Sequence, residues 1–338
     1  MILKVKYDDP PSGTVKALDI TDYLIRCTWS GDSEQMARKL ELEIAYNSVI
    51  KDSCFLNLDL KLGGRITLTY VDNFGQSTDI FSGRIFYRKR NTNSYNFNIT
   101  AYDDLIYLAK NKLCLTFYNA GVSEALKNVC SKIGVDMADN QPQLSTLVNF
   151  IADEKSGSEI INMLLEKETA ATGKKYMATS VNGKLSVVER GQVIKDFVAS
   201  DLINVTESEH GEGYESMINR VEIWNENGDY LKSISADDDL KEFGLLQTIY
   251  KIKPPVEGES VDNIKAATAL LHSVDSESQI KALGNIQCIT GYSIHVSEEQ
   301  LHGTFLIKSD SHIFENNTHI MSLALGYVES EESNEKRR

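Results

Sequence analysis

The sequence predicts a mainly β protein in which two related antiparallel β-barrels or sandwiches flank a small inserted α/β segment. The first supporting observation is a weak internal repeat that matches residues 62–102 with residues 283–327. The second is the spacing of apolar residues, which alternates in both copies and becomes helical only between them. Because an alternating strand has one buried and one wetter face, each copy should form an antiparallel sheet with its own core.

The repeat consists of three strands in each copy. The first strands carry Ile66/Leu68/Tyr70 in one copy and Tyr292/Ile294/Val296 in the other. A glycine-centred frame follows, Phe81-x-Gly83-x-Ile85-x-Tyr87 against Leu301-x-Gly303-x-Phe305-x-Ile307. After an asparagine-rich turn (Asn91 and Asn93; Asn316 and Asn317), the third strands carry Phe97/Ile99/Ala101 and Met321/Leu323/Leu325. If the copies are related, Gly83 and Gly303 should superpose.

Residues 1–102 are predicted to form the first barrel, and residues 103–190 the inserted α/β domain. In the first range, 14–29 and 39–46 have the pattern of strands, whereas 32–38 and 52–57 have that of loops or turns. In the second, residues 103–111 favour a short helix or turn. Ser123 should cap a helix that Gly134 ends, and a second helix should begin at Ser158 and end at Gly173. Asn182-Gly183 predicts a tight hairpin over 175–188.

Residues 191–328 are predicted to form the second barrel, which also holds short helices, and residues 329–338 a charged tail. Asn227-Gly228 predicts a hairpin over 220–234. A helix over 237–243 should end at Gly244, and Ser260 or Asp262 should cap a helix that reaches Leu271.

Composition excludes several classes of protein. No apolar run approaches the ~20 residues that cross a bilayer, and the alternating start lacks the core of a secretory signal. A net charge of −14 argues against stable nucleic-acid binding. Five cysteines without a C-x-x-C pair predict buried single thiols in a reducing compartment rather than disulfides or a zinc site (Cys27, Cys54, Cys114, Cys130, Cys288).

Four histidines near the C-terminus are the strongest metal candidates (His295, His302, His312, His319). The pairs 295/302 and 312/319 are each seven residues apart, and an odd separation cannot place two ligands on one face of one strand. We therefore predict solvated or singly hydrogen-bonded histidines and no metal site.

Acidic clusters at Asp8-Asp9, Asp103-Asp104 and Asp237–Asp239 raise the alternative of acid–base catalysis by paired carboxylates. Neighbouring strand residues point to opposite sides, however, and Asp237–Asp239 suit a helix N-terminus. Ser208 and His210 lie outside any G-x-S-x-G motif, and Cys130 lies on an apolar helix stripe. The sequence thus predicts no catalytic, cofactor-binding or metal-binding residue, no cofactor and no enzyme activity.

Three stretches resemble the baseplate hub family of contractile phage tails, defective prophages and tail-like bacteriocins of Gram-positive bacteria. The last stretch, 284–327, contains G-x-F-x-I-x-S-D-S-H and then T-H-x-M-x-L-x-L. The second is 99–111 followed by 117–134, which is similar to the entry into the family's inserted domain, and the third is 218–251, which is similar to the start of its second barrel. The resemblance implies two tube-type barrels per chain.

The resemblance also implies a structural role. Such hubs are homotrimers whose six barrels join a hexameric tail tube to a threefold central spike, with the inserted domain meeting other baseplate components. They are assembled in the bacterial cytoplasm into a virion or bacteriocin particle, without insertion into a membrane. Two alternatives stay open at this point, a peptidoglycan hydrolase of the same injection machinery and a glycan-binding β module.

Overall fold

The computed structural model describes residues 2–45, 59–91, 96–252 and 262–327. The predicted tail 329–338, the predicted loop 52–57, Cys54, Asn93 and Ser260 lie outside these residues. The chain divides into a large unit, which comprises residues up to Ser208 and from Gln279 onward, and a small unit, Glu209–Ser278. The predicted domain bounds of 102 and 190 stay a prediction, and the sequence did not anticipate the small unit.

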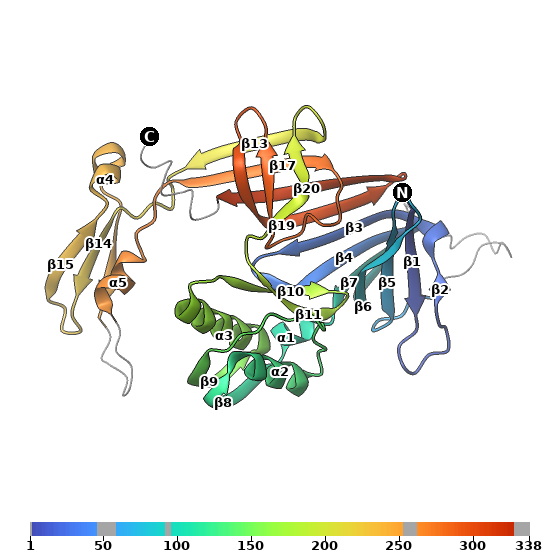
Figure 1. The fold of residues 1–338 in the computed structure, drawn as a ribbon, viewed down its shortest axis with the longest axis horizontal. Coiled ribbons are helices and arrows are strands. Elements are labelled where there is room, and N and C mark those ends of the chain that lie inside the picture. Colours follow the sequence, from blue (N-terminus) through green and yellow to red (C-terminus); the bar gives the residue numbers. More distant parts are fainter. Residues whose placement is uncertain (1, 46–58, 92–95, 253–261, 328–338) are drawn as a thin grey trace. The chain divides into compact units, whose positions relative to one another are not determined.

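Six strands build the N-terminal β-sheet, which we call the N-repeat (Figure 1). In spatial order it runs β3-β4-β7-β6-β5-β1, with the two-residue β2 added beside β1. The strands are β1 (Ile2–Asp8), β2 (Leu18–Asp19), β3 (Leu24–Asp32), β4 (Gln35–Ala45), β5 (Arg65–Val71), β6 (Ser77–Asn91) and β7 (Asn96–Asp103). Their alternating apolar residues form one buried core, as predicted. The loop or turn predicted at 32–38 is present but shorter: the turn comprises Ser33 and Glu34, β4 begins at Gln35, and the polar Arg38 is buried in that strand.

A second set of six strands, the C-repeat, has the same spatial order, β13-β17-β20-β19-β18-β12. These are β12 (Val193–Ser200), β13 (Val205–Gly213), β17 (Asp275–Leu283), β18 (Ser293–Ser297), β19 (His302–Glu315) and β20 (Thr318–Tyr327). Each strand also holds the same place along the chain as its counterpart, which confirms the predicted repeat. One difference separates the repeats: β12 runs parallel to β18, whereas β1 runs antiparallel to β5.

The register of the two repeats corrects the predicted glycine alignment. A β-bulge follows Ile85 in the β6–β7 ladder and Ile307 in the β19–β20 ladder, so these two isoleucines are equivalent. Gly83 therefore corresponds to Phe305, and the Gly83–Gly303 match is wrong by two residues, although the buried face is preserved. The alignment was wrong because the sequence around the two glycines contains no residue from which the position of the bulge could be predicted.

A different pair of glycines does correspond. The N–H of Gly63 donates to the carbonyl of Ile85, and the N–H of Gly291 donates to the carbonyl of Ile307, at 2.8 and 3.0 Å. Both glycines have a positive φ, 77° and 93°, which glycine adopts at little cost. Each turns the chain into the strand that pairs with the first half of the long central strand.

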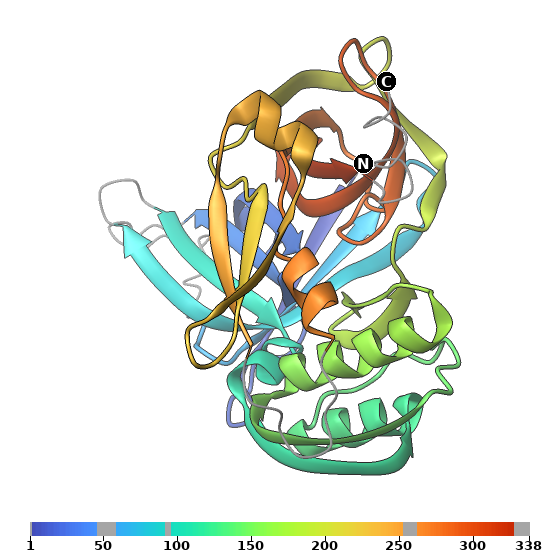
Figure 2. The ribbon, with the colours of Figure 1, turned by 90° about the vertical axis from the view of Figure 1, so that its left-hand side faces the viewer.

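The inserted segment packs two longer helices, α2 (Val122–Ile133) and α3 (Gly157–Thr172), side by side (Figure 2). Its other elements are α1 (Ile106–Lys110), β8 (Lys112–Gly121), β9 (Leu147–Ser156), β10 (Tyr176–Val181) and β11 (Lys184–Glu189). Gly134 and Gly173 end the helices in the left-handed conformation, and Asn182-Gly183 turns the hairpin, as predicted. The predicted cap at Ser123 is wrong, because Ser123 lies inside α2. The predicted start at Ser158 is within one residue of the observed start at Gly157, and Ser156 forms a capping box with Glu159.

The small unit contains a three-stranded sheet, β15-β14-β16, with two short helices. Its elements are β14 (Arg220–Trp224), β15 (Tyr230–Ser235), α4 (Asp237–Phe243), β16 (Gln247–Lys251) and α5 (Asn263–Thr268). The hairpin, the stop at Gly244 and the Asp262 cap match the predictions. Its sequence holds 15 acidic against six basic residues, so most of the chain's net charge of −14 lies in this unit.

Candidate functional site at the junction of the two repeats

The junction between the two repeats is made by β3, which lies between β4 and β19 in one continuous sheet. Ser309–Glu315 of β19 pair with Arg26–Asp32 of β3 in antiparallel register. Along its other edge, the same part of β19 pairs with β20. The first residues of β19, from His302 to Leu306, pair with β18. The second half of β19 is thus enclosed on both sides, and its side chains build the site described below.

A buried ion pair crosses the junction. The guanidinium of Arg38 on β4 donates two hydrogen bonds to the carboxylate of Asp310 on β19, one of them from Nη1 at 3.0 Å. The side chains are 3% and 0% exposed. Burial disfavours the charged carboxylate, but the charge of Arg38 and the hydrogen bonds from His312 and Arg38 outweigh it, and the pKa of Asp310 lies well below its usual range. A buried pair of this kind is costly to break because the remaining charge has no water around it.

The surroundings of Arg38 and Asp310 fit this pair closely. Thr290 donates its backbone N–H and its hydroxyl to Asp310 Oδ1, at 2.7 and 2.6 Å. Arg38 lies over the ring of Trp29, 3.9 Å from its centre, so a cation–π contact adds to the pair. A Cβ at Gly31 would lie 2.4 Å from Arg38 Nη1, so a larger residue there would displace the guanidinium from its place beside Asp310.

Two of the four C-terminal histidines that the sequence offered as metal candidates, His312 and His319, complete the junction. His312 Nδ1 lies 3.0 Å from His319 Nε2, and His312 Nε2 lies 3.1 Å from the carbonyl of Cys288. Both rings are buried, and His319 stacks on Phe314. The parity argument failed here because the turn at Asn316-Asn317 places the two histidines on paired strands, β19 and β20, rather than on one strand. His295 and His302 are exposed, as expected of solvated strand residues.

Burial and the nearby His312 lower the pKa of His319 to about 3. His319 Nδ1 has no partner among the described residues. A protonated His319 would therefore be a buried charge. The histidine pair fits a packed core position, and the described residues hold no cluster of three groups that could bind a metal.

Asp103 connects the junction to the inserted segment. Its carboxylate accepts the backbone N–H of Arg38 at 2.9 Å and that of Leu105 at 3.0 Å. Burial raises the pKa of Asp103 to about 6, despite these bonds and one from Ser180 of β10. Asp104 lies beside Arg65 and Arg84 instead, so the two neighbouring carboxylates do not form a catalytic pair.

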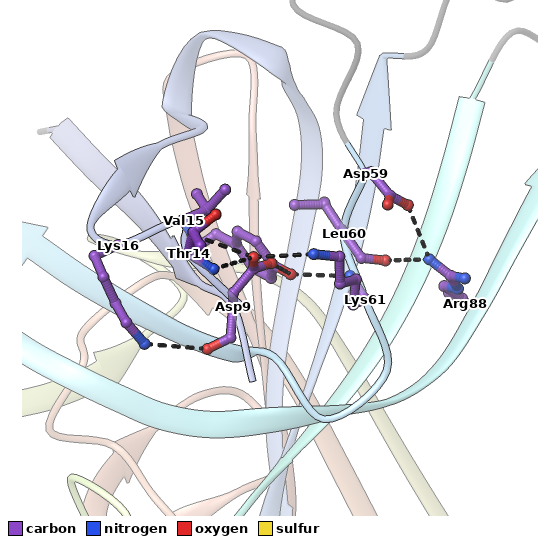
Figure 3. Close-up of polar contacts among 9 residues, drawn as sticks. Asp9, Thr14, Val15, Lys16, Asp59, Leu60, Lys61 and Arg88 are labelled. Atoms are coloured by element: carbon purple, nitrogen blue, oxygen red, sulfur yellow. Dashed lines mark hydrogen bonds and ion pairs between the residues drawn. The ribbon is translucent and has the colours of Figure 1, made fainter. Parts of the chain in front are cut away.

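A second polar cluster fixes the start of the N-repeat (Figure 3). Asp9 accepts hydrogen bonds from Tyr7 Oη at 2.8 Å, from the backbone N–H of Thr14 and Val15, and from Lys61 Nζ at 3.0 Å. The bonds from Lys61 and Tyr7 lower the pKa of Asp9 to about 2. This cluster ties the loop after β1 to the segment before β5, so Asp9 has a structural role.

The other sequence candidates are not brought together. Ser208 donates to Glu298, whereas His210 bonds Ser278, so they do not form a nucleophile and base. Asp237 accepts from Ser235, and Asp238 lies near Lys241 at the start of α4. Cys27, Cys130 and Cys288 are buried single thiols as predicted, but Cys114 is exposed.

The site described here is thus enclosed and has its charges paired. It offers no solvent-facing acid, base or nucleophile among its named residues, and what it can do chemically is to hold two sheets in one register. None of the described helices is long and apolar enough to cross a membrane.

Comparison with known proteins gives a family and a fold. The sequence model of the YQBQ-like family matches residues 27–326. Two Bacillus subtilis proteins are similar: YqbQ, which is uncharacterised, with 24% identity over 254 residues, and XkdQ of the phage-like element PBSX, with 22% over 258. In both cases 72% of this chain and 77% of the relative are covered.

Among solved structures, the 43 kDa tail protein of prophage MuSo2 from Shewanella oneidensis has the same fold. It matches with a TM-score of 0.67 and 12% identity, over 96% of this chain and 98% of that one. The mainly β architecture with an inserted α/β segment is therefore that of a phage tail protein.

Proposed function

The chain belongs to the YQBQ-like family, and from this premise we propose that it is the structural baseplate hub of a contractile phage tail or a tail-like bacteriocin. In this role three chains form a ring that joins the hexameric tail tube to the threefold central spike. Assembly takes place in the bacterial cytoplasm, and the chain becomes part of the particle.

The observation that carries this proposal is the duplicated six-strand sheet. Both repeats have the same strand order, and β3 of one pairs with β19 of the other inside a single chain. Three such chains would present six related sheets, which is the number that a sixfold tube requires above a threefold spike. A closed ring of this kind needs head-to-tail contacts between unlike surfaces.

The buried junction supports a structural rather than an enzymatic role. A buried, paired network across the junction would resist sliding of one sheet past the other, as a purely structural part requires. The carboxylates that suggested hydrolysis have structural contacts instead. We infer that the chain has no catalytic residue of its own.

The proposal is tested in the strain that encodes the chain. Tail particles are purified from a strain with an epitope on the chain and from a deletion strain, and both are imaged by cryo-electron microscopy. We expect three chains per particle between tube and spike, and no assembled baseplates in the deletion strain. Complete baseplates without the chain would contradict the proposal, and clearing of peptidoglycan by purified wild-type protein would contradict the absence of catalysis.

A further inference from the structure

We propose that the small unit binds a neutral polysaccharide on the outer face of its three-stranded sheet. The inference goes beyond the proposed function and does not rest on it. Its basis is a pair of aromatic rings, Trp224 and Tyr230, on the face of the sheet that is turned away from the core of the unit.

The two faces of this sheet differ in character. Val221 and Ile223 of β14 are buried in a small core that they share with α5. Because side chains alternate along a strand, Arg220, Glu222 and Trp224 point to the opposite face. The sheet therefore has an inner face covered by α5 and an outer face with a different set of side chains.

The outer face exposes apolar side chains. Tyr230 of β15 pairs with the half-buried Trp224 and is 49% exposed, and Ile249 of β16 pairs with Glu222 and is 51% exposed. The rings of Trp224 and Tyr230 are 5.8 Å apart and inclined by 75° to each other. Grouped exposed apolar side chains that include tryptophan and tyrosine are typical of binding surfaces.

Polar groups surround the aromatic pair and fix its position. Glu222 accepts a hydrogen bond from Trp224 Nε1 at 3.1 Å, and its other carboxylate oxygen lies 3.9 Å from Nη2 of Arg220. The indole is thus held by its polar edge, so its ring carbons are left for contact with a ligand. Gln247 of β16 pairs with Arg220 and adds an exposed amide to the same face.

This combination of groups matches the chemistry of a sugar ring. The C–H groups of a pyranose form a weakly apolar face that stacks on an aromatic ring, while its hydroxyls need hydrogen-bond donors and acceptors beside that ring. Glu222 supplies acceptors, Arg220 donors, and Gln247 both. An open sheet face suits a chain of sugars, because small single molecules are bound in pockets that enclose most of their surface.

The charge of the small unit excludes anionic polymers. Residues 209–278 hold 15 acidic against six basic residues, which is a net charge of −9. A field of this sign repels nucleic acids and polysaccharides that carry phosphate or uronic acid groups. Among polymers that offer flat stacking surfaces, an uncharged polysaccharide therefore fits this face.

Tryptophan fluorescence tests the proposal, because the chain has two tryptophans and Trp29 is buried, 3% exposed. Full-length protein is titrated with the neutral chains chitohexaose and cellohexaose and with the anionic chain hexagalacturonate. We expect a saturable shift of the emission with at least one neutral chain, and binding of the anionic chain that is about tenfold weaker or more. Trp224→Phe should remove the shift, because the reporter is lost.

Tyr230→Ala keeps Trp224 as the reporter and should weaken binding by about tenfold or more. The matched control is Tyr118→Ala, since Tyr118 of β8 is 88% exposed and lies outside the small unit. Thermal unfolding confirms that each variant is folded before binding is compared. The control should bind as the wild type does.

Three outcomes overturn the site: no saturable response to either neutral chain, a response that Tyr230→Ala leaves unchanged, or equal binding of the anionic chain. If the wild type binds no sugar but Tyr230→Ala prevents incorporation of the chain into tail particles, the face is a contact with another protein. A threefold hub in purified particles would support the proposed function in every one of these cases, so the two proposals fail separately.

Discussion

The second halves of β19 and β6 share one backbone frame but differ in their surroundings. On β19, Asp310 and His312 are buried and bonded across the junction to β3 and β4. On β6, the equivalent positions are Arg88 and Arg90, which are exposed. The backbone frame is shared by both repeats, whereas the side chains of this half-strand are buried in the C-repeat and exposed in the N-repeat.

The largest expected effect comes from breaking the closed edge. Asp310→Ala leaves Arg38 as a buried charge without its carboxylate, so we expect the free energy of unfolding to fall by about 3–5 kcal/mol. Denaturant titration measures this loss. Asp79→Ala is the matched control, because Asp79 is an exposed carboxylate that bonds Thr69 on the N-repeat. A loss as small as that of the control would show that the pair does not hold the junction.

The next effect concerns pH. The pKa of His319 is about 3 in the folded chain and 6.5 in its ordinary state, so below pH 6.5 the unfolded chain takes up a proton that the folded chain does not. Stability should therefore fall as pH drops, by ~1.4 kcal/mol per pH unit from this residue. Asp103 acts in the opposite direction between pH 6 and 3.8, because its folded pKa is raised to about 6.

The contribution of His319 is isolated by comparing wild type with His319→Phe, since Asp103 titrates in both. The stability difference between them should change by about 3 kcal/mol from pH 6 to pH 4, in favour of the variant at the lower pH. Chemical unfolding at several pH values measures it. If the unfolding free energies of wild type and variant changed in parallel with pH, His319 would not be held neutral at the junction.

The smallest effect is expected on the exposed half of β6. Lys89→Glu should change the unfolding free energy of the chain by no more than about 0.5 kcal/mol, because Lys89 is exposed. Denaturant titration measures the change. A large loss of stability would place Lys89 in the core of the N-repeat and would remove the contrast between the two half-strands.

Local signals predicted much of this fold. Gly134 and Gly173 end helices, and Asn182-Gly183 turns a hairpin, because each needs a backbone conformation that few other residues accept. Alternation identified the buried faces of β5, β7 and β20. The glycine frame failed because bulges shift register without leaving a composition signal.

The junction could not be predicted from local patterns. Arg38 is a charged residue in a polar stretch, a pattern that predicts an exposed loop. Only its ion pair with Asp310, 272 positions away, explains why it is buried. Strand parity shows which face is apolar but not which strand lies beside it, so the pairing of β3 with β19 left no trace in spacing. His312 and His319 were misjudged for the same reason, since their contact crosses two strands.

The central claim is that the buried pair of Arg38 and Asp310 holds the two repeats together where β3 meets β19. A double-mutant cycle of Arg38→Met and Asp310→Leu, followed by chemical unfolding, tests it most directly. We predict that each single variant loses about 3–5 kcal/mol of unfolding free energy and that the double variant loses less than the sum of the two. Losses that simply add would contradict the account.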